Sequence, residues 1–158
     1  MAFQDGPIQG VVITPIRKFR DDRGWLAEVF RSDEIAPEYQ PAMGYLSTSL
    51  PGVVRGPHEH EEQADLFVFL GPGEFKITLW DNRKALPSYG SRMVVFGGEG
   101  NPIQVLIPPG VVHAYRNLSL KASVVLNFPN QLFQGEGKKQ PIDEIRHEDD
   151  PETPFKPD

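Results

Sequence analysis

Three of the four histidines in the sequence fall in two short stretches whose spacing could carry chemistry. His58 and His60 are one residue apart, and His113 follows a Pro-Pro-Gly turn further along the chain. If His58 and His60 lie on a strand, they point to the same face, because side chains two apart share a face. A neutral imidazole accepts a proton or binds a metal ion. On the inward face of a barrel, burying such a polar pair costs free energy unless the pair binds a ligand or a metal ion. The alternative is that these histidines lie in surface loops.

The segments that must position these histidines have the pattern of short strands joined by turns. β-Branched or alternating stretches cover residues 10–15, 24–30, 42–49, 65–70, 74–80, 92–96, 103–107, 111–115 and 122–127. Fifteen glycines and sixteen prolines argue against a helical bundle. Short strands spaced about 8–12 residues apart predict a β-sandwich or small barrel. The one helix we expect is short, near Ser32–Ala36, with Ser32 as its cap.

Composition excludes several classes of protein. The 158 residues are enough for one domain, and the absence of cysteine excludes disulfides, zinc fingers, iron–sulfur sites and thiol nucleophiles. A net charge of −6 argues against nucleic acid as a partner. There is no apolar run of about 20 residues for a membrane helix. The first residues have no signal-peptide pattern, so we expect a cytoplasmic protein without a membrane partner.

The composition changes after Phe128 and Pro129. Residues 134–158 are mostly polar and offer few side chains that could fill a core. We therefore expect a barrel domain over residues 1–133 and a polar C-terminal tail over residues 134–158. Ile142, Ile145 and Phe155 are the side chains expected to dock the tail; the alternative is a disordered end.

Two spaced patterns resemble the motifs of the cupin superfamily. The first comprises Gly52, His58, His60, Asp65 and Gly71. The second comprises Pro108, Gly110, His113 and Asn117. This resemblance implies an all-β fold, a double-stranded β-helix or jelly-roll barrel, with the site in the mouth of the barrel.

A narrower resemblance covers about residues 8–133. Four ordered elements carry it: Asp-Asp-Arg-Gly-Trp-Leu-Ala-Glu-Val-Phe at 21–30, Ser49 to His58 with Arg55-Gly-Pro-His58, Asp81-Asn-Arg with Pro-Ser-Tyr-Gly at 87–90, and Ile107 to His113. They are similar to the RmlC-like dTDP-4-dehydrorhamnose 3,5-epimerase family. The resemblance implies an isomerase that removes a proton next to the keto group of a dTDP-4-keto-6-deoxy sugar, in deoxysugar or surface-polysaccharide biosynthesis.

The resemblance also implies roles for individual residues. His58 becomes the general base, and His113 and Asp81 join it as catalytic residues. Substrate binding falls to seven residues of the matched elements and their surroundings: Arg23, Trp25, Glu28, Tyr45, Arg55, His60 and Tyr115. Arginine suits the diphosphate and the enolate oxygens because guanidinium binds such oxygens in a bidentate manner. The family works without a cofactor and is dimeric, which implies a homodimer; residues 10–15 look like a paired edge strand.

Some positions depart from the family's pattern. The tyrosine that returns the proton falls on Leu132, with Phe133 beside it, and neither can donate a proton. The family's pattern has a lysine at the position of Asp65 and a glutamine at the position of His60. We therefore expect either that Tyr45 or Tyr115 donates the proton, or that the enzyme works from one face. The His58-x-His60 doublet is similar to that of nucleotide-sugar 3,4-ketoisomerases, for which one face is enough.

Two other classes of function stay open. One is a metal-dependent cupin enzyme, in which His58, His60, Asp65 and His113 would bind a divalent transition metal such as Fe, Mn, Ni, Cu or Zn. The other is a protein that binds a nucleotide sugar without catalysis.

Overall fold

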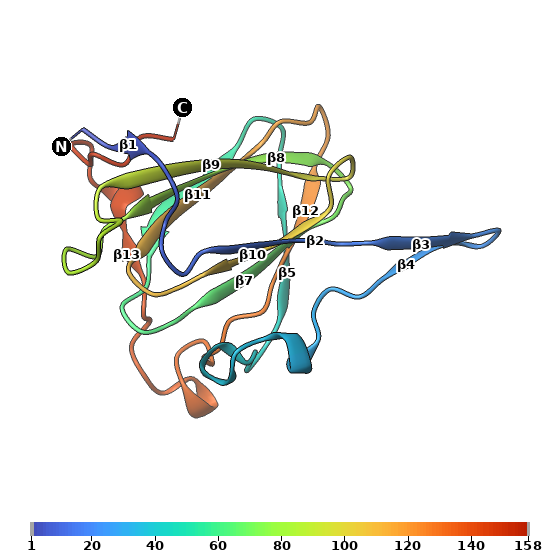
Figure 1. The fold of residues 1–158 in the computed structure, drawn as a ribbon, viewed down its shortest axis with the longest axis horizontal. Coiled ribbons are helices and arrows are strands. Elements are labelled where there is room, and N and C mark those ends of the chain that lie inside the picture. Colours follow the sequence, from blue (N-terminus) through green and yellow to red (C-terminus); the bar gives the residue numbers. More distant parts are fainter. Residues whose placement is uncertain (1, 158) are drawn as a thin grey trace.

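Two β-sheets packed face to face make up most of the computed structural model, which describes residues 2–157 (Figure 1). The six-stranded sheet has the order β1 (Gln4–Asp5), β9 (Ser91–Gly98), β8 (Glu74–Asp81), β11 (Val111–Asn117), β6 (Val54–Glu59) and β13 (Ile145–Arg146). The five-stranded sheet has the order β2 (Val12–Pro15), β10 (Ile103–Ile107), β7 (Asp65–Phe69), β12 (Ser123–Asn127) and β5 (Tyr45–Ser49). The predicted all-β jelly-roll class is confirmed.

The core lies between the two sheets and follows the alternation of the sequence. Phe75, Ile77 and Leu79 of β8 face it, and all three are at most 1% exposed. On the opposite sheet β10 contributes every second residue, Ile103, Val105 and Ile107. Burying each of these side chains contributes about 1.5–3 kcal/mol, so the sheets are held together by the same period of two that predicted the strands.

The structure differs from the prediction in its short elements. Two 3-10 turns, η1 (Ser32–Glu34) and η2 (Pro37–Tyr39), replace the single helix, and no side chain caps η1. Two further 3-10 turns lie in the C-terminal segment, η3 (Glu136–Lys138) and η4 (His147–Asp149). None of the helices among residues 2–157 has the length and apolar character needed to cross a membrane.

The C-terminal segment is part of the barrel wall. Its strand β13 extends the six-stranded sheet by pairing with β6, so that Arg146 lies opposite His58. Phe155 is 5% exposed and packs on Trp80 and Phe3, on the outer side of this sheet. The prediction that Phe155 docks the tail holds. Ile142 and Ile145 are instead 51% and 39% exposed. Ile145 lies in β13, which is held by backbone pairing with β6, and Ile142 lies before that strand.

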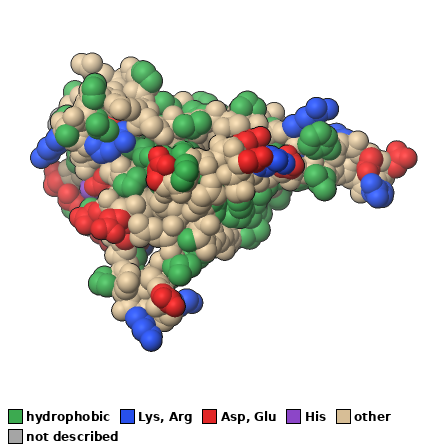
Figure 2. Space-filling model, turned by 60° about the horizontal axis from the view of Figure 1, so that its bottom comes forward, with side chains coloured by type: hydrophobic (Ala, Val, Ile, Leu, Met, Phe, Trp, Pro, Cys, Tyr) green, Lys and Arg blue, Asp and Glu red, His purple; other side chains and the backbone are tan. Residues whose placement is uncertain are grey.

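A two-stranded hairpin of β3 (Lys18–Asp21) and β4 (Gly24–Ala27) projects from the barrel (Figure 1). In Figure 2 it forms a narrow extension whose surface carries hydrophobic, basic and acidic side chains. Phe19, Trp25 and Leu26 of this hairpin are all exposed. Within one chain, the hairpin therefore buries little apolar surface.

A β-bulge in β6 decides which side chains enter the barrel. His113 of β11 lies opposite His58, but Tyr115 lies opposite Arg55, so β6 has one extra residue between the two pairs. Because His113 and Tyr115 share a face, Arg55 and His58 do so too, although they are three residues apart. Gly56 occupies the bulge with φ +83°, and a Cβ there would lie 2.5 Å from the His113 carbonyl oxygen. Only glycine fits this position without displacing β11.

Replacing Gly56 by alanine tests the bulge. We expect Gly56→Ala to lower the free energy of unfolding by about 3 kcal/mol or more, because left-handed strain costs about 1–3 kcal/mol and the clash adds to it. Gly52→Ala is the matched control, since Gly52 has φ +72° with nothing within 4 Å of the added Cβ. It should cost only about 1 kcal/mol. Urea denaturation measures both, and equal losses would contradict the role of the bulge.

Candidate active site

Three imidazoles meet inside the barrel: His58 from β6, His60 from directly after β6, and His113 from β11. The ring centroids of His58 and His113 are 4.4 Å apart, those of His60 and His113 5.8 Å, and those of His58 and His60 6.0 Å. Antiparallel pairing of β6 with β11 brings the two predicted stretches together. One ring nitrogen from each of the three histidines lies within 4.8 Å of the other two, close enough to hold a metal ion.

Asp65 lies beneath these imidazoles at the start of β7 and is 1% exposed. Its Oδ2 lies 3.1 Å from His60 Nε2 and 3.3 Å from His113 Nε2. Its Oδ1 accepts hydrogen bonds from the side-chain amides of Gln63 and Asn127, each at 2.9 Å. Every oxygen of this buried carboxylate thus has polar partners, which burial of a charge requires.

Burial and this carboxylate shift the pKa values of the cluster in opposite directions. Burial, with a contribution from His113, lowers the pKa of His58 to about 2, so its imidazole is neutral. Burial is the largest influence on His60 and acts against its protonation, but the hydrogen bonds and negative charges of Asp65 and Asp143 together outweigh it and raise the pKa of His60 to about 9. For Asp65, hydrogen bonds from His113 and His60 overcome burial and hold its pKa well below the usual range.

Asp143 of the C-terminal segment fixes the turn that follows His60. Its carboxylate accepts hydrogen bonds from the backbone N–H groups of Glu61, Glu62 and Gln63, at 2.8, 2.9 and 2.8 Å. Its backbone carbonyl is in hydrogen-bond contact with Nδ1 of His60. A residue about 80 positions further along the chain therefore orients one imidazole of the cluster.

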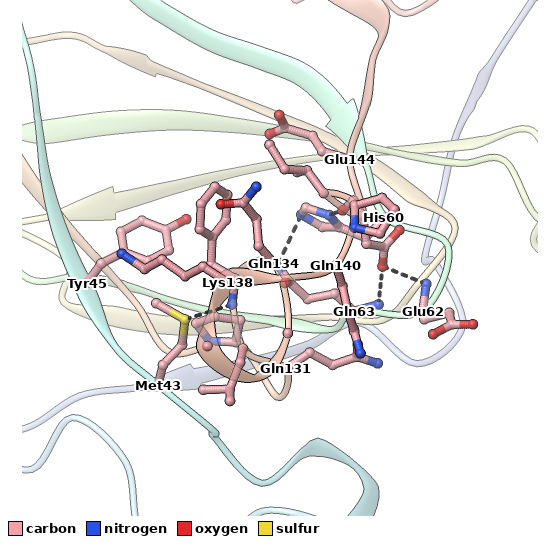
Figure 3. Close-up of a pocket in the computed structure, with 18 of the residues that line it drawn as sticks. Met43, Tyr45, His60, Glu62, Gln63, Gln131, Gln134, Lys138, Gln140 and Glu144 are labelled. Atoms are coloured by element: carbon pink, nitrogen blue, oxygen red, sulfur yellow. Dashed lines mark hydrogen bonds between the residues drawn. The ribbon is translucent and has the colours of Figure 1, made fainter.

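A cavity of about 870 Å³ opens above the cluster (Figure 3). His58 and His60 form part of its lining, while Met43 and Tyr45 line it from β5 and its approach. The rest of the wall comes mainly from residues 129–144 of the chain, between β12 and β13. The volume suits a small-molecule ligand. In Figure 3, Tyr45 and Lys138 lie on one side of the cavity and His60 on the other.

Tyr45 is the phenol of this cavity. Asn127 donates a hydrogen bond from its side-chain amide to the Tyr45 hydroxyl at 2.9 Å, and the same amide nitrogen reaches Asp65. Burial raises the pKa of Tyr45 to about 12, so the hydroxyl keeps its proton. Leu132 and Phe133 also line the cavity. The wall is therefore apolar at the position where the family's pattern places its tyrosine.

Several residues predicted to form the site do not line this cavity in their own chain. Asp81 is fully buried, and its carboxylate accepts hydrogen bonds from Arg83 and Ser88, so it stabilises a turn. Tyr115 is 5% exposed in the core. Arg55 donates to Ser49 Oγ and to the Thr48 carbonyl.

The predicted binding residues of the hairpin region are also elsewhere. Arg23 is paired with Asp21 at the exposed tip, and Trp25 stacks under the Lys18 ammonium group at 4.5 Å from its ring centroid. Glu28 pairs with Arg31. These residues lie away from the cavity because the hairpin extends away from the barrel. The sequence motif did not reveal the direction of the hairpin.

Sequence reasoning missed the residues that the C-terminal segment supplies. Lys138 and Gln140 line the cavity, and Asp143 orders the histidine turn. No motif or spacing marks them, because contacts across about 80 residues leave no local pattern. The positive φ of Lys138, +57°, next to Gly137 shows only that the segment turns sharply there.

The sequence of this chain is similar to those of polysaccharide and glycan biosynthesis proteins. A model of the family described as dTDP-4-dehydrorhamnose 3,5-epimerase matches residues 5–146. The spore coat polysaccharide biosynthesis protein SpsL of Bacillus subtilis is 37% identical over 140 residues, which cover 87% of this chain and 91% of that protein. A Haloferax volcanii protein described as a probable low-salt glycan biosynthesis epimerase is 35% identical over 130 residues, covering 82% of this chain and 83% of that protein.

Solved structures share the fold. A dTDP-4-dehydrorhamnose 3,5-epimerase from Sulfolobus tokodaii has a TM-score of 0.68 at 29% identity, covering 82% of this chain and 75% of that one. A dTDP sugar isomerase from Desulfovibrio desulfuricans has a TM-score of 0.75 at 23% identity, covering 88% and 84%. The predicted jelly-roll fold and the resemblance seen in the sequence are confirmed.

Proposed function

The chain belongs to the dTDP-4-dehydrorhamnose 3,5-epimerase family, and we propose that it epimerises a dTDP-4-keto-6-deoxy sugar for polysaccharide biosynthesis. The observation that carries this proposal is the placement of His58 and Tyr45 in one cavity. Epimerisation at a carbon needs a base on one face of the sugar and an acid on the other. The two residues can supply both.

His58 is the base in this proposal. It lines the cavity, whereas Asp65 engages the other two imidazoles of the cluster. Its nitrogen takes the proton from the carbon next to the keto group, and the electrons of that C–H bond move to the carbonyl oxygen as an enolate. A C–H bond breaks as an N–H bond forms on His58, and the Tyr45 O–H bond breaks as the new C–H bond forms. No oxidation state changes overall, so the reaction needs no redox cofactor.

Tyr45 returns the proton to the other face. Its hydroxyl accepts a hydrogen bond from Asn127, which leaves its own hydrogen free to donate to the enolate carbon. Figure 3 supports this direction, since Tyr45 and the histidine side of the cavity lie opposite each other. Tyr45 then takes the place of the tyrosine that the family pattern puts at Leu132.

One-face ketoisomerisation fits the site less well. It needs two free bases side by side, and the sequence offered His58 and His60 for this purpose. Both nitrogens of His60 are engaged, Nε2 by Asp65 and Nδ1 by the Asp143 carbonyl. His58 alone remains available on that strand.

We also propose that the enzyme is a homodimer in which the hairpin of one protomer reaches the cavity of its partner. Arg23 and Trp25, predicted to bind substrate, lie on the hairpin of β3 and β4, which extends away from the barrel, and neither lines the cavity of its own chain. The outer edges of the five-stranded sheet expose Val12 and Leu46, and the hairpin exposes Leu26. A paired edge strand in a dimer would cover apolar side chains of this kind. The predicted cytoplasmic location stays a prediction.

Proton exchange in deuterated water tests the catalytic pair. With dTDP-4-keto-6-deoxyglucose, NMR should show deuterium entering at C3, C5 or both. His58→Gln should slow this exchange by about 10²- to 10⁴-fold, the range for loss of a general base. Tyr45→Phe should keep exchange, because the base remains, but form far less epimer. Tyr115→Phe removes a core phenol outside the cavity and is the matched control. Absence of exchange in the wild type as in His58→Gln would refute the proposal for this substrate.

Sedimentation tests the dimer. The wild type should give twice the chain mass of 17.7 kDa at micromolar concentration. Leu46→Asp should shift it toward the monomer, because a carboxylate would be buried in the interface. Leu120→Asp, at a loop side chain that is 99% exposed, is the control and should remain dimeric. A wild-type mass near 17.7 kDa would contradict the proposal.

A further inference from the structure

The wall of the cavity carries little positive charge. Within residues 2–157, Lys138 is the one lysine or arginine that lines it. The acidic residues of the lining are Glu62, Asp143 and Glu144. His60 also lines the cavity, but both of its ring nitrogens are engaged, by Asp65 and by the Asp143 carbonyl. Lys138 is therefore the lining cation whose N–H groups are not already taken by the barrel.

Lys138 lies on the same side of the cavity as Tyr45. In Figure 3 its side chain runs toward Tyr45, and His60 lies on the other side. The loop that carries Lys138 is closed by its own backbone, since the Gln140 N–H donates to the Gln134 carbonyl at 2.8 Å. This closed loop places the lysine next to the phenol.

The backbone of this loop is strained at two positions. Gln134 and Lys138 both have φ +57°, and within residues 2–157 they are the two non-glycine residues with a left-handed φ. Both of them line the cavity. Such a conformation costs about 1–3 kcal/mol, and glycine would avoid most of the cost. Strain of this kind gathers at functional sites, which indicates that these two side chains have a role in the cavity.

Tyr45 leaves a negative charge behind when it donates its proton. A phenolate is unfavourable at this place, because burial raises the pKa of Tyr45 to about 12 and the negative charges of Asp65 and Glu144 add to the increase. The hydrogen bond from Asn127 to the Tyr45 oxygen acts in the opposite direction but carries no charge. A cation next to the phenol favours its ionised form.

We propose that the Lys138 ammonium group stabilises the phenolate that forms when Tyr45 gives its proton to the sugar. A lysine ammonium is a compact charge on a flexible stem, which suits a single phenolate oxygen. The Tyr45 O–H bond breaks as the new C–H bond of the epimer forms, and Lys138 keeps all its protons. Water then returns a proton to Tyr45, which is 44% exposed. This role rests on the proposed function, because it gives a partner to the acid of that reaction.

Proton exchange and epimer yield, measured on the same sample, test this role. Lys138→Gln should exchange protons at the wild-type rate, because His58 still removes them. It should form about 10-fold less epimer per exchange event or even less, the effect of one charge a few ångström from another in a partly hydrated site. Lys138→Arg keeps the charge and should keep most of the yield.

Two comparisons show that the effect belongs to this pair of residues. Lys139→Gln is the matched control, because Lys139 is the neighbouring lysine and does not line the cavity. It should give the wild-type yield. In Tyr45→Phe, adding Lys138→Gln should lower the yield no further, since residues that act together are not additive.

A titration of the protein without substrate tests the pairing directly. A fluorinated tyrosine at position 45 ionises at lower pH than tyrosine, so its phenolate forms while lysine side chains are still charged. Its pKa is read by ¹⁹F NMR. Lys138→Gln should raise this pKa by about half a unit or more, because the cation that favours the phenolate is lost. Lys139→Gln should leave the pKa unchanged.

The outcomes separate this inference from the proposed function. A pKa that does not rise in Lys138→Gln would overturn the inference, and so would a wild-type epimer yield in that variant. Slower proton exchange in Lys138→Gln would also overturn it, because the lysine would then act on the enolate. A wild type without any exchange would refute the proposed function for this substrate, while the ¹⁹F titration would still decide whether Lys138 acts on Tyr45. Circular dichroism checks that each variant is folded.

Discussion

A buried carboxylate is the constraint on which this structure depends. Asp65 is 1% exposed, and an ionised group in that position is stable only when its partners are complete. Two imidazoles and two amides supply them, from the segment after β6, from β11 and from β12. The hydrogen bonds and ion pairs of the Asp65 carboxylate therefore hold strands of both sheets in register. The same contacts form the floor of the cavity.

This constraint divides the three histidines by role. His60 and His113 are bound to Asp65 and oriented by carbonyls, so they cannot move toward a substrate. His58 reaches the same face through the bulge at Gly56 and stays accessible. The network continues from Asp65 through Asn127 to Tyr45. One chain of hydrogen bonds thus sets the position of both the proposed acid and the atoms around the base.

The sequence predicted what local patterns encode. Alternation in β8 and β10 predicted strands and core, and the His58 and His113 stretches predicted the strands that form the site. It did not predict the bulge, because Gly56 and Pro57 look like a break in the strand. It also missed Asp143 and Lys138, whose contacts with the barrel cross long stretches of sequence. The motif at Arg23 and Trp25 was visible, but the direction of its hairpin depends on tertiary packing.

Nitrogen NMR of ¹⁵N-histidine-labelled protein tests the central claim most directly, because the chain has only four histidines. Long-range proton–nitrogen correlations report which ring nitrogen carries hydrogen. The account predicts a neutral His58 and a His60 that carries hydrogen on both ring nitrogens near pH 7, because the pKa of His58 is lowered to about 2 and that of His60 is raised to about 9. A His58 that is doubly protonated near pH 7 would contradict it, because such an imidazole could not accept a proton from the sugar.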